Sequence, residues 1–263
     1  MAPSDPPGRS AESRRSESEA FLCCSVRIDA ITIEDAIDQL LSGKAYGAVH
    51  LCNAYTLSLA SSDPSLAREL NRGSLNLADG KPVVWIARRL GFKHLTRRVY
   101  GPELMERTLD AGQSMGTNHY LYGSSPDVID ALTAQIQRRW PDARIVGAES
   151  PSFAPLSDAD LDAASARFDS SGAQIVWVGL GTPKHDLVVA EFADRSNLTF
   201  VAVGAAFDFI GGEKRQAPRW MREHGFEWLF RLASEPRRLW RRYLVGNTVF
   251  LWRVIRTRPV RIE

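Results

Sequence analysis

The chain has 263 residues, of which 44% are hydrophobic and 24% are charged. This composition is typical of a globular protein and excludes wholesale disorder, a collagen-like fibre and a coiled coil. The sequence has no long uncharged apolar run, so a membrane-spanning helix is not expected. Its three cysteines, Cys23, Cys24 and Cys52, are too few for a disulfide framework and lack the spacing of a zinc site, which favours a reducing compartment.

The net charge of +2 conceals an uneven distribution of charge along the chain. Residues 214–263 carry 13 Lys and Arg against four Asp and Glu, a net charge of +9, whereas the rest of the chain carries −7. A basic segment on an acidic body indicates an anionic partner, which is a membrane surface, a phosphate group or a nucleic acid.

The chain begins with a segment that predicts no structure. Residues 1–20 are rich in Pro, Ser, Glu and Arg and carry few apolar side chains. We expect a disordered tail there, and the segment lacks the apolar stretch of a secretory signal.

Residues 21–212 alternate between short apolar runs and helical patterns. The runs that predict strands lie at 48–52, 75–77, 119–122, 144–146, 174–178 and 198–203. The patterns that predict helices lie at 32–41, 82–90, 102–112, 126–140, 158–168 and 183–194, and several have proline in their first turn. A capping box of Thr32 and Asp35 starts the first helix. The alternation predicts an α/β core in which helices cover a parallel sheet.

Residues 213–263 differ from this core and predict a basic helical appendage. No strand is expected after about Gln216, and residues 236–255 predict one helix. On a helical wheel, apolar side chains fall on one face and arginines on the other: Leu239, Trp240, Tyr243, Leu244, Phe250, Leu251 and Val254 against Arg237, Arg238, Arg241, Arg242, Arg253 and Arg256. The pattern favours a helix on a membrane surface, and the alternative is a helix packed on the body with a solvated basic face.

Ligands of parallel α/β sheets bind at the carboxyl ends of the strands, so the residues after each predicted strand are the candidates. Asn53 follows the first run, and Asp79 follows the second. An amide at this place positions a ligand hydroxyl, and a carboxylate acts as a general base. Each residue has an alternative role as the cap of the helix that follows, which is the commoner one.

Glycine-rich turns follow two of the later strands. Gly123 lies where a strand opens into a helix, a place that suits a phosphate. The stronger motif is 179–186, in which Gly179 and Gly181 allow a ligand to approach the backbone. Lys184 stands where the dinucleotide fingerprint has a third glycine. His185 in this motif is either a ligand contact or a polar surface residue.

The sequence gives little support for a metal-dependent enzyme or a serine hydrolase. The Asp-x-Asp pairs at 158–162 fall in the first turn of a helix, where acidic residues favour the helix dipole, so no metal site is expected. A Ser-His-Asp hydrolase would need a Gly-x-Ser-x-Gly elbow, which is missing. Arg98, beside a Gly-Pro turn, suits a diphosphate or carboxylate, or is simply surface charge.

Taken together, these stretches resemble the WecG/TagA/CpsF family of bacterial glycosyltransferases. Three blocks carry the resemblance: Asn53-Ala54 with 78–85; 98–105; and 178–184 followed by 207–212, 215–218, 227–232 and 235–236. The resemblance covers residues 23–243, and the order and spacing of the blocks make it specific.

The resemblance implies a Rossmann-like α/β core with a C-terminal appendage. It implies an inverting transferase that needs neither metal nor cofactor and moves a sugar, of the N-acetylmannosamine or glucose type, from a UDP-sugar to a polyprenyl-diphosphate-linked saccharide. The place of the reaction would be the cytoplasmic face of the membrane, in cell-surface polysaccharide or teichoic acid synthesis. Family members also self-associate in solution, so a homo-oligomer is expected, with the appendage closing the site in the monomer.

The resemblance assigns roles to individual residues. Asp79 falls on the family's general base, Asn53 on an asparagine of the same pocket, and Arg98 on an arginine near the diphosphate. The appendage arginines that would hold the lipid diphosphate are Arg231, Arg238 and Arg241. The other residues expected to bind substrate are Gly123, Gly179, Gly181, Thr182, Lys184, His185 and Asp208.

The chain departs from the family pattern at two places. His185-Asp186 replaces a Gln-Glu pair whose glutamine reaches the substrate, and Leu51 replaces a threonine. The variant at 81–85 is closer to the branch that donates glucose. Two alternatives remain: a nucleotide-binding oxidoreductase, which Lys184 disfavours, and a non-enzymatic membrane-binding protein. Nucleic acid is the weaker partner, because the apolar helix face suits a bilayer.

Overall fold

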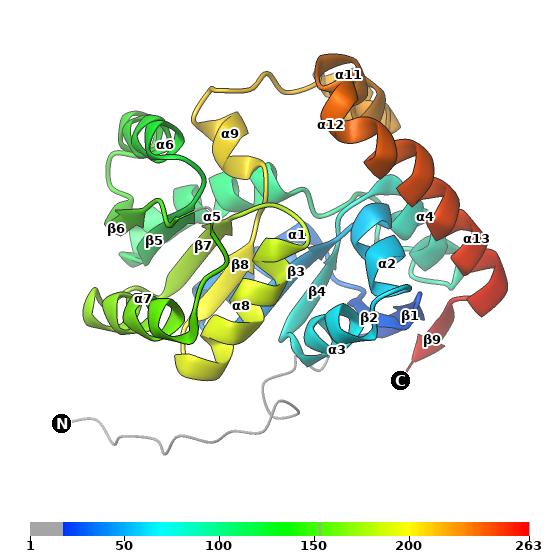
Figure 1. The fold of residues 1–263 in the computed structure, drawn as a ribbon, viewed down its shortest axis with the longest axis horizontal. Coiled ribbons are helices and arrows are strands. Elements are labelled where there is room, and N and C mark those ends of the chain that lie inside the picture. The colour runs from blue at the N-terminus through cyan, green and yellow to red at the C-terminus, as the bar shows by residue number, and fades with distance from the viewer. Residues whose placement is uncertain (1–17, 153, 263) are drawn as a thin grey trace.

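The computed structural model describes residues 18–152 and 154–262, so nearly all of the tail expected at 1–20 lies outside the described residues. One nine-stranded sheet runs through the described chain in the order β6-β5-β7-β8-β3-β4-β2-β1-β9 (Figure 1). The strands are β1 (Ala20–Cys23), β2 (Val26–Asp29), β3 (Gly47–Cys52), β4 (Leu75–Ala78), β5 (Asn118–Gly123), β6 (Arg144–Glu149), β7 (Ile175–Gly179), β8 (Thr199–Ala202) and β9 (Val260–Ile262). From β6 to β2 the neighbours are parallel, and β1 pairs antiparallel with both β2 and β9.

The central strands are apolar on both faces, because helices cover both sides of the sheet. In β7, Ile175 and Trp177 face one core while Val176 and Val178 face the other. This period of two is that of a strand buried on both faces, which reads in sequence as a continuous apolar run.

The helices form two layers around the sheet. One face carries α1 (Ile33–Leu41), α5 (Gly101–Met115), α6 (Pro126–Arg139) and α9 (Ala206–Ile210). The other carries α2 (Ala54–Ala60), α3 (Pro64–Arg72), α4 (Lys81–Arg89), α7 (Asp158–Ser170) and α8 (Lys184–Arg195). The predicted α/β fold with a mostly parallel sheet is confirmed.

Each predicted run and helical pattern of the core corresponds to an element of the structure. The capping box is present: the Asp35 N–H donates to Thr32 Oγ1 at 3.2 Å, and the Thr32 N–H donates to Asp35 Oδ2 at 3.0 Å. The sequence did not predict β1, β2, α3 or α9, and it offered α2 only through the alternative role of Asn53 as the cap of a following helix. The expectation of no strand in the appendage is wrong, because β9 adds to the sheet edge by pairing with β1.

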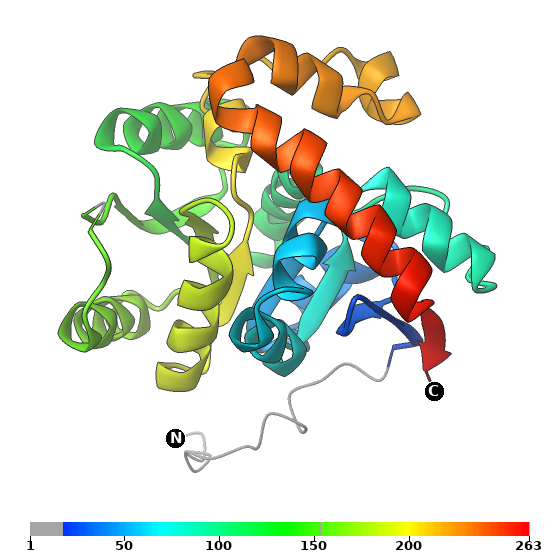
Figure 2. The same ribbon diagram turned by 45° about the vertical axis from the view of Figure 1, so that its right-hand side comes forward.

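The appendage consists of α10 (Arg219–His224), α11 (Glu227–Ser234) and a rod made of α12 (Pro236–Trp240), the π-helical turn η2 (Arg241–Gly246) and α13 (Asn247–Thr257). Figure 2 shows the rod running from above the strand ends, past α2, to β9. The single helix predicted at 236–255 is thus present, but its middle is wound differently.

The π-helical turn divides the apolar face that the wheel predicts. A π turn holds an extra residue, so side chains after Gly246 are rotated from their places on a regular wheel. Leu239 and Phe250 are buried, whereas Trp240, Leu244 and Leu251 are exposed. No helix of residues 18–152 or 154–262 is long and apolar enough to cross a membrane.

Candidate functional site

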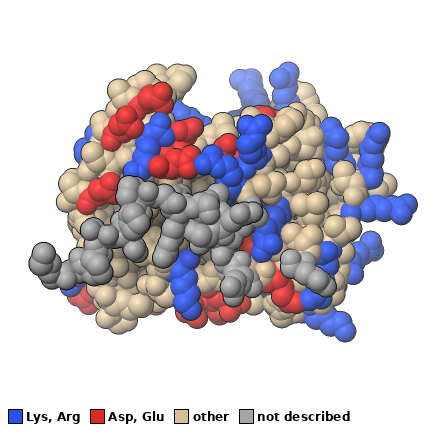
Figure 3. Space-filling model, turned by 90° about the horizontal axis from the view of Figure 1, so that it is seen from below, with Lys and Arg blue, Asp and Glu red and all other residues tan. Residues whose placement is uncertain are grey.

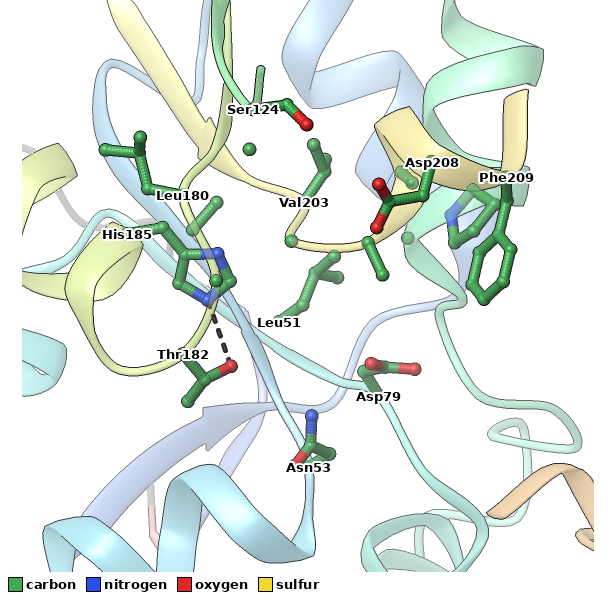
Figure 4. Close-up of a pocket in the computed structure, with 18 of the residues that line it drawn as sticks. Leu51, Asn53, Asp79, Ser124, Leu180, Thr182, His185, Val203, Asp208 and Phe209 are labelled. Atoms are coloured by element: carbon green, nitrogen blue, oxygen red, sulfur yellow. Dashed lines mark hydrogen bonds between the residues drawn. The ribbon is translucent and has the colours of Figure 1, made fainter. Parts of the chain in front are cut away.

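A cavity of about 410 Å³ opens at the carboxyl edge of the sheet (Figure 4). The strands end level there, because Cys52 pairs with Ala78 and Gly123 pairs with Gly179. The lining comes from five strand ends, from core helices that include α8 and α9, and from the appendage: Leu51, Asn53, Asp79, Ser124, Gly179, Leu180, Gly181, Thr182, Val203, Gly204, His185, Asp208, Phe209, Arg231, Arg238 and Arg242, among others. The sheet therefore brings together residues that are far apart in the sequence.

Asp79 is the acidic side chain at the centre of this edge. Its backbone N–H donates to the Cys52 carbonyl at 3.0 Å, which fixes the residue just beyond β4. Its Oδ1 is buried and accepts no hydrogen bond from the described residues. The alternative role as a cap is not observed, since Gly80 is the N-cap of α4 and no side chain caps that helix.

Burial raises the pKa of Asp79 above its usual range, and the nearby Glu227 carboxylate acts in the same direction. The guanidinium groups of Arg98 and Arg242 oppose this shift without cancelling it. A carboxylate with a raised pKa binds a proton more strongly than an exposed aspartate does. This property suits a general base near neutral pH.

Asn53 caps α2 and also lines the cavity. Its Oδ1 accepts from the N–H groups of Tyr55 at 3.0 Å and Thr56 at 3.2 Å. The cap uses the oxygen, and the amide nitrogen points toward the cavity on the side of Asp79 (Figure 4). The two roles that the sequence allowed are therefore compatible in one side chain.

Arg98 lies beside Asp79 on the side facing the appendage. Its Nη1 is 3.7 Å from Asp79 Oδ1, and its Nη2 donates to Oε2 of Glu227, a residue of α11 that is only 8% exposed. The Tyr100 hydroxyl donates to the other Glu227 oxygen at 3.3 Å, and the Arg98 guanidinium stacks over the Tyr100 ring. Arg98 thus links the appendage to Asp79 and does not line the cavity of about 410 Å³.

Three arginines of the appendage line the cavity: Arg231, Arg238 and Arg242. Arg242 lies over the Tyr55 ring, with its guanidinium carbon 5.0 Å from the ring centroid, and burial lowers its pKa. Arg241 is exposed, stacks on Trp240 and does not line the cavity. Of the three arginines expected to hold a lipid diphosphate, Arg231 and Arg238 line this cavity and Arg241 does not, whereas Arg242 does.

The glycine turn after β7 forms one wall. A side chain at Gly179 would meet the Phe207 ring at 2.6 Å, so this position has no room for a Cβ. Gly181 has a φ of +78° and open space around it, and Thr182 follows in the lining. The turn therefore offers backbone atoms at close range to a ligand.

His185 reaches the same wall and is held by a buried carboxylate. Its Nε2 lies 3.2 Å from Asp186 Oδ2 and 3.3 Å from Thr182 Oγ1 (Figure 4). The Nδ1–H of buried His50, in β3, donates to Asp186 Oδ1 at 3.1 Å. His185 Nδ1 has no hydrogen-bond partner among the described residues. Although burial acts the other way, His185 and His50 hold the pKa of Asp186 well below its usual range.

Of three other residues expected to bind substrate, Asp208 lines the cavity, whereas Gly123 and Lys184 do not. Asp208 lines the cavity, where its Oδ2 accepts from Lys214 Nζ at 2.9 Å. Gly123 packs against the Gly179 backbone and is not part of the lining, which Ser124 supplies instead. The Lys184 ammonium donates to the Ala154 carbonyl at 3.1 Å and does not line the cavity.

A second cavity, of about 240 Å³, lies on the appendage side of Asp79. The two cavities share Asn53, Asp79, Tyr100, Arg231 and Arg242. The second one adds aromatic side chains: Tyr55, Trp85, Trp228 and Tyr243. Asp79 thus stands at the junction of two cavities. The first is lined by the glycine turn and the strand ends, and the second has aromatic walls.

Sequence reasoning missed Glu227, Tyr100 and the inward position of Arg242. The basic C-terminal segment indicated that arginines contribute to a site. Which of these arginines turn inward depends on the winding of η2.

Among residues 18–152 and 154–262, no three His, Cys, Asp or Glu side chains cluster as metal ligands would.

A comparison with protein-family models finds one match over nearly all of the described chain. The model described as the glycosyl transferase WecG/TagA/CpsF family matches residues 21–262. The match includes the strand ends that line the cavity, together with α10 to α13 and β9. The family that the sequence motifs resemble is therefore confirmed.

Proposed function

The chain belongs to the WecG/TagA/CpsF family of glycosyltransferases, and from this premise we propose that it moves a sugar from a UDP-sugar to a saccharide on a polyprenyl diphosphate. The transfer inverts the anomeric carbon and needs no metal. The observation that carries the proposal is the position of Asp79 at the junction of two cavities, where its Oδ1 accepts no hydrogen bond from the described residues and three arginines line the larger of the two.

Asp79 is the general base of this reaction. Its carboxylate takes the proton of the acceptor hydroxyl while that oxygen attacks the anomeric carbon on the face opposite to the UDP. The bond between the anomeric carbon and the UDP oxygen breaks as the new bond forms. A single displacement of this kind inverts the configuration, and the raised pKa of Asp79 favours the proton transfer.

The departing UDP gains a negative charge on its terminal phosphate. Arg231, Arg238 and Arg242 line the cavity in which this charge develops. Guanidinium groups bind phosphate oxygens through paired hydrogen bonds, and groups held in place before the reaction stabilise the developing charge without reorganising. The arginines thus supply the positive charge that the leaving group requires.

The two cavities suit the two substrates. The cavity of about 410 Å³, with its glycine turn and Ser124, takes the UDP-sugar, whose phosphates approach the backbone closely. The cavity with aromatic walls takes the acceptor, since Trp85, Trp228 and Tyr243 offer ring faces to a sugar. Both substrates then meet at Asp79.

The surface of the appendage suits an anionic membrane. Trp240, Leu244 and Trp252 are exposed on the rod, and arginines stack on the two tryptophan rings. In Figure 3, Lys and Arg crowd the right-hand edge, on the side where Figure 1 places α4 and α13, whereas Asp and Glu gather toward the left. We infer that this side holds the enzyme at the cytoplasmic membrane face.

The test is UDP release from a panel of UDP-sugars, with and without a polyprenyl-diphosphate-linked acceptor, in the presence of EDTA. We expect release that requires acceptor, persists in EDTA and is lost in Asp79→Asn. Asp162→Asn is the matched control, because that carboxylate is 70% exposed on α7. UDP release that does not depend on the acceptor, or that persists in Asp79→Asn, would contradict the proposal. The UDP-sugar that supports release identifies the donor sugar.

A further inference from the structure

An apolar groove of about 970 Å³ lies between α4 and α13. The rod packs mainly on α2, through the buried Phe250 and the close approach of Gly246 to the Tyr55 ring, and so stands clear of α4. The groove walls expose Trp85 at 58%, Leu251 at 58% and Ile255 at 76% of their surface. So much apolar surface in one concave place marks a binding site more often than chance exposure.

The groove continues the cavity with aromatic walls. The two share four lining residues: Ala54, Pro82, Trp85 and Asn247. The Trp85 side chain borders both, so a ligand that leaves the Asp79 junction through the aromatic cavity passes directly into the groove. The groove therefore extends the acceptor side of the site, away from the glycine turn.

The charges at the groove indicate what kind of molecule lies along it. Arg88, Arg89 and Lys93 line one side, whereas α13 contributes mainly apolar side chains to the opposite wall: Phe250, Leu251, Val254 and Ile255. A hydrocarbon chain fits the apolar wall, and the cations suit the phosphate groups of surrounding lipids.

We propose that this groove binds the first isoprene units of the acceptor's polyprenyl chain. The inference rests on the proposed function, because it requires an acceptor with a lipid chain. The chain enters the groove past Trp85 while the sugar to be extended stays at Asp79. Binding in the groove removes apolar surface from water, so each isoprene unit that it covers strengthens acceptor binding.

The experiment uses the full chain and acceptors that differ only in their number of isoprene units, at concentrations below micelle formation and without membranes. We expect the acceptor KM to fall by about threefold or more for each unit that the groove covers. In Leu251→Gln and Ile255→Gln this dependence on chain length should be reduced. Val245→Gln is the matched control, since Val245 is 51% exposed on the same rod but does not line the groove.

Binding of free prenyl monophosphates of increasing length, measured by calorimetry, gives a readout that does not depend on transfer. A second outcome is that no donor supports transfer, but prenyl binding still strengthens with chain length and weakens in Leu251→Gln. The proposed function would then be wrong, whereas the assignment of the groove as a prenyl-binding site would be supported. Equal KM values at every chain length would overturn the groove. Groove variants that lose only self-association in sedimentation would also overturn the proposal, because a second copy of the chain would then occupy the groove. The same holds for variants that lose only vesicle binding, because bulk lipid would then be the occupant.

Discussion

Glu227 and Arg98 form a partly buried ion pair that fastens the appendage to the strand-end site. The second nitrogen of the same guanidinium lies 3.7 Å from Asp79. Glu227 belongs to α11, so the position of the appendage affects the electrostatics of the proposed base. Arg98 lowers the pKa of Asp79, and Glu227 raises it.

This arrangement predicts opposite shifts in the pH profile of two variants. The base must be ionised, so activity falls as the pH drops through the pKa of Asp79. Arg98→Gln removes a cation that lowers this pKa, and we expect the acid limb of kcat/KM to move to higher pH. Glu227→Gln removes a carboxylate that raises it, and the acid limb should move down.

The check is kcat/KM for the acceptor across the pH range for the wild type and both variants. Arg219→Gln is the control, since that arginine is 85% exposed and pairs with Glu223 on the same helix. Shifts in the same direction in both variants would show that a change in appendage position, rather than charge at Asp79, controls the profile.

Asp79→Asn should separate activity from stability. Loss of the general base is expected to reduce kcat by about 10²- to 10⁴-fold. The folded-state pKa of Asp79 is raised, so its contribution to stability is present at low pH and is lost as the pH rises through that pKa. At neutral pH the neutral amide should therefore increase the free energy of unfolding. Thermal melts at neutral and acid pH measure this; a lower melting temperature at neutral pH would contradict it.

Two adjacent arginines provide a sharp test of the cavity lining. Arg242 lines both cavities, whereas Arg241 stacks on Trp240 at the surface. Without membranes, Arg242→Ala should lower kcat/KM by about 10²-fold, the scale of one group that stabilises transition-state charge. Arg241→Ala should change it little under the same conditions. Equal losses in the two variants would mean that the η2 turn does not place Arg242 as described.

The core was predictable because its signals are local. Buried strands read as apolar runs, and a helix start such as Thr32 with Asp35 is fixed by residues three apart. The same logic placed Asn53 and Asp79 at one sheet edge, since parallel strands end on the same side. The family motifs then gave these residues roles that the pattern alone left open.

The parts that were missed depend on contacts far apart in the sequence. β9 is a strand only because it pairs with β1, at the other end of the chain. The ion pair of Arg98 with Glu227 joins residues 129 positions apart, and no local pattern signals it. The inward turn of Arg242 follows from the π-helical winding of η2, whereas a wheel assumes regular α-helix throughout.

The buried pair of His50 and Asp186 predicts a linked change in stability and donor binding. Asp186 accepts from His50 and lies against His185, which lines the cavity that we propose for the donor. Asp186→Asn replaces a charged acceptor by a neutral amide, which should lower the free energy of unfolding at neutral pH by about 2 kcal/mol. His185 then loses its fixed orientation, and the KM for the donor should rise more than the KM for the acceptor.

The pH dependence of stability gives an independent check of the same residue. The folded-state pKa of Asp186 lies well below its usual range, so its stabilising effect is present above the unfolded value of about 4 and is lost as the pH falls. The difference in melting temperature between wild type and Asp186→Asn should therefore narrow below about pH 4. Asp162→Asn, which removes an exposed partner of Arg195, should cost less than about 1 kcal/mol. If Asp186→Asn melts like that control, the buried pair contributes no more than a surface one.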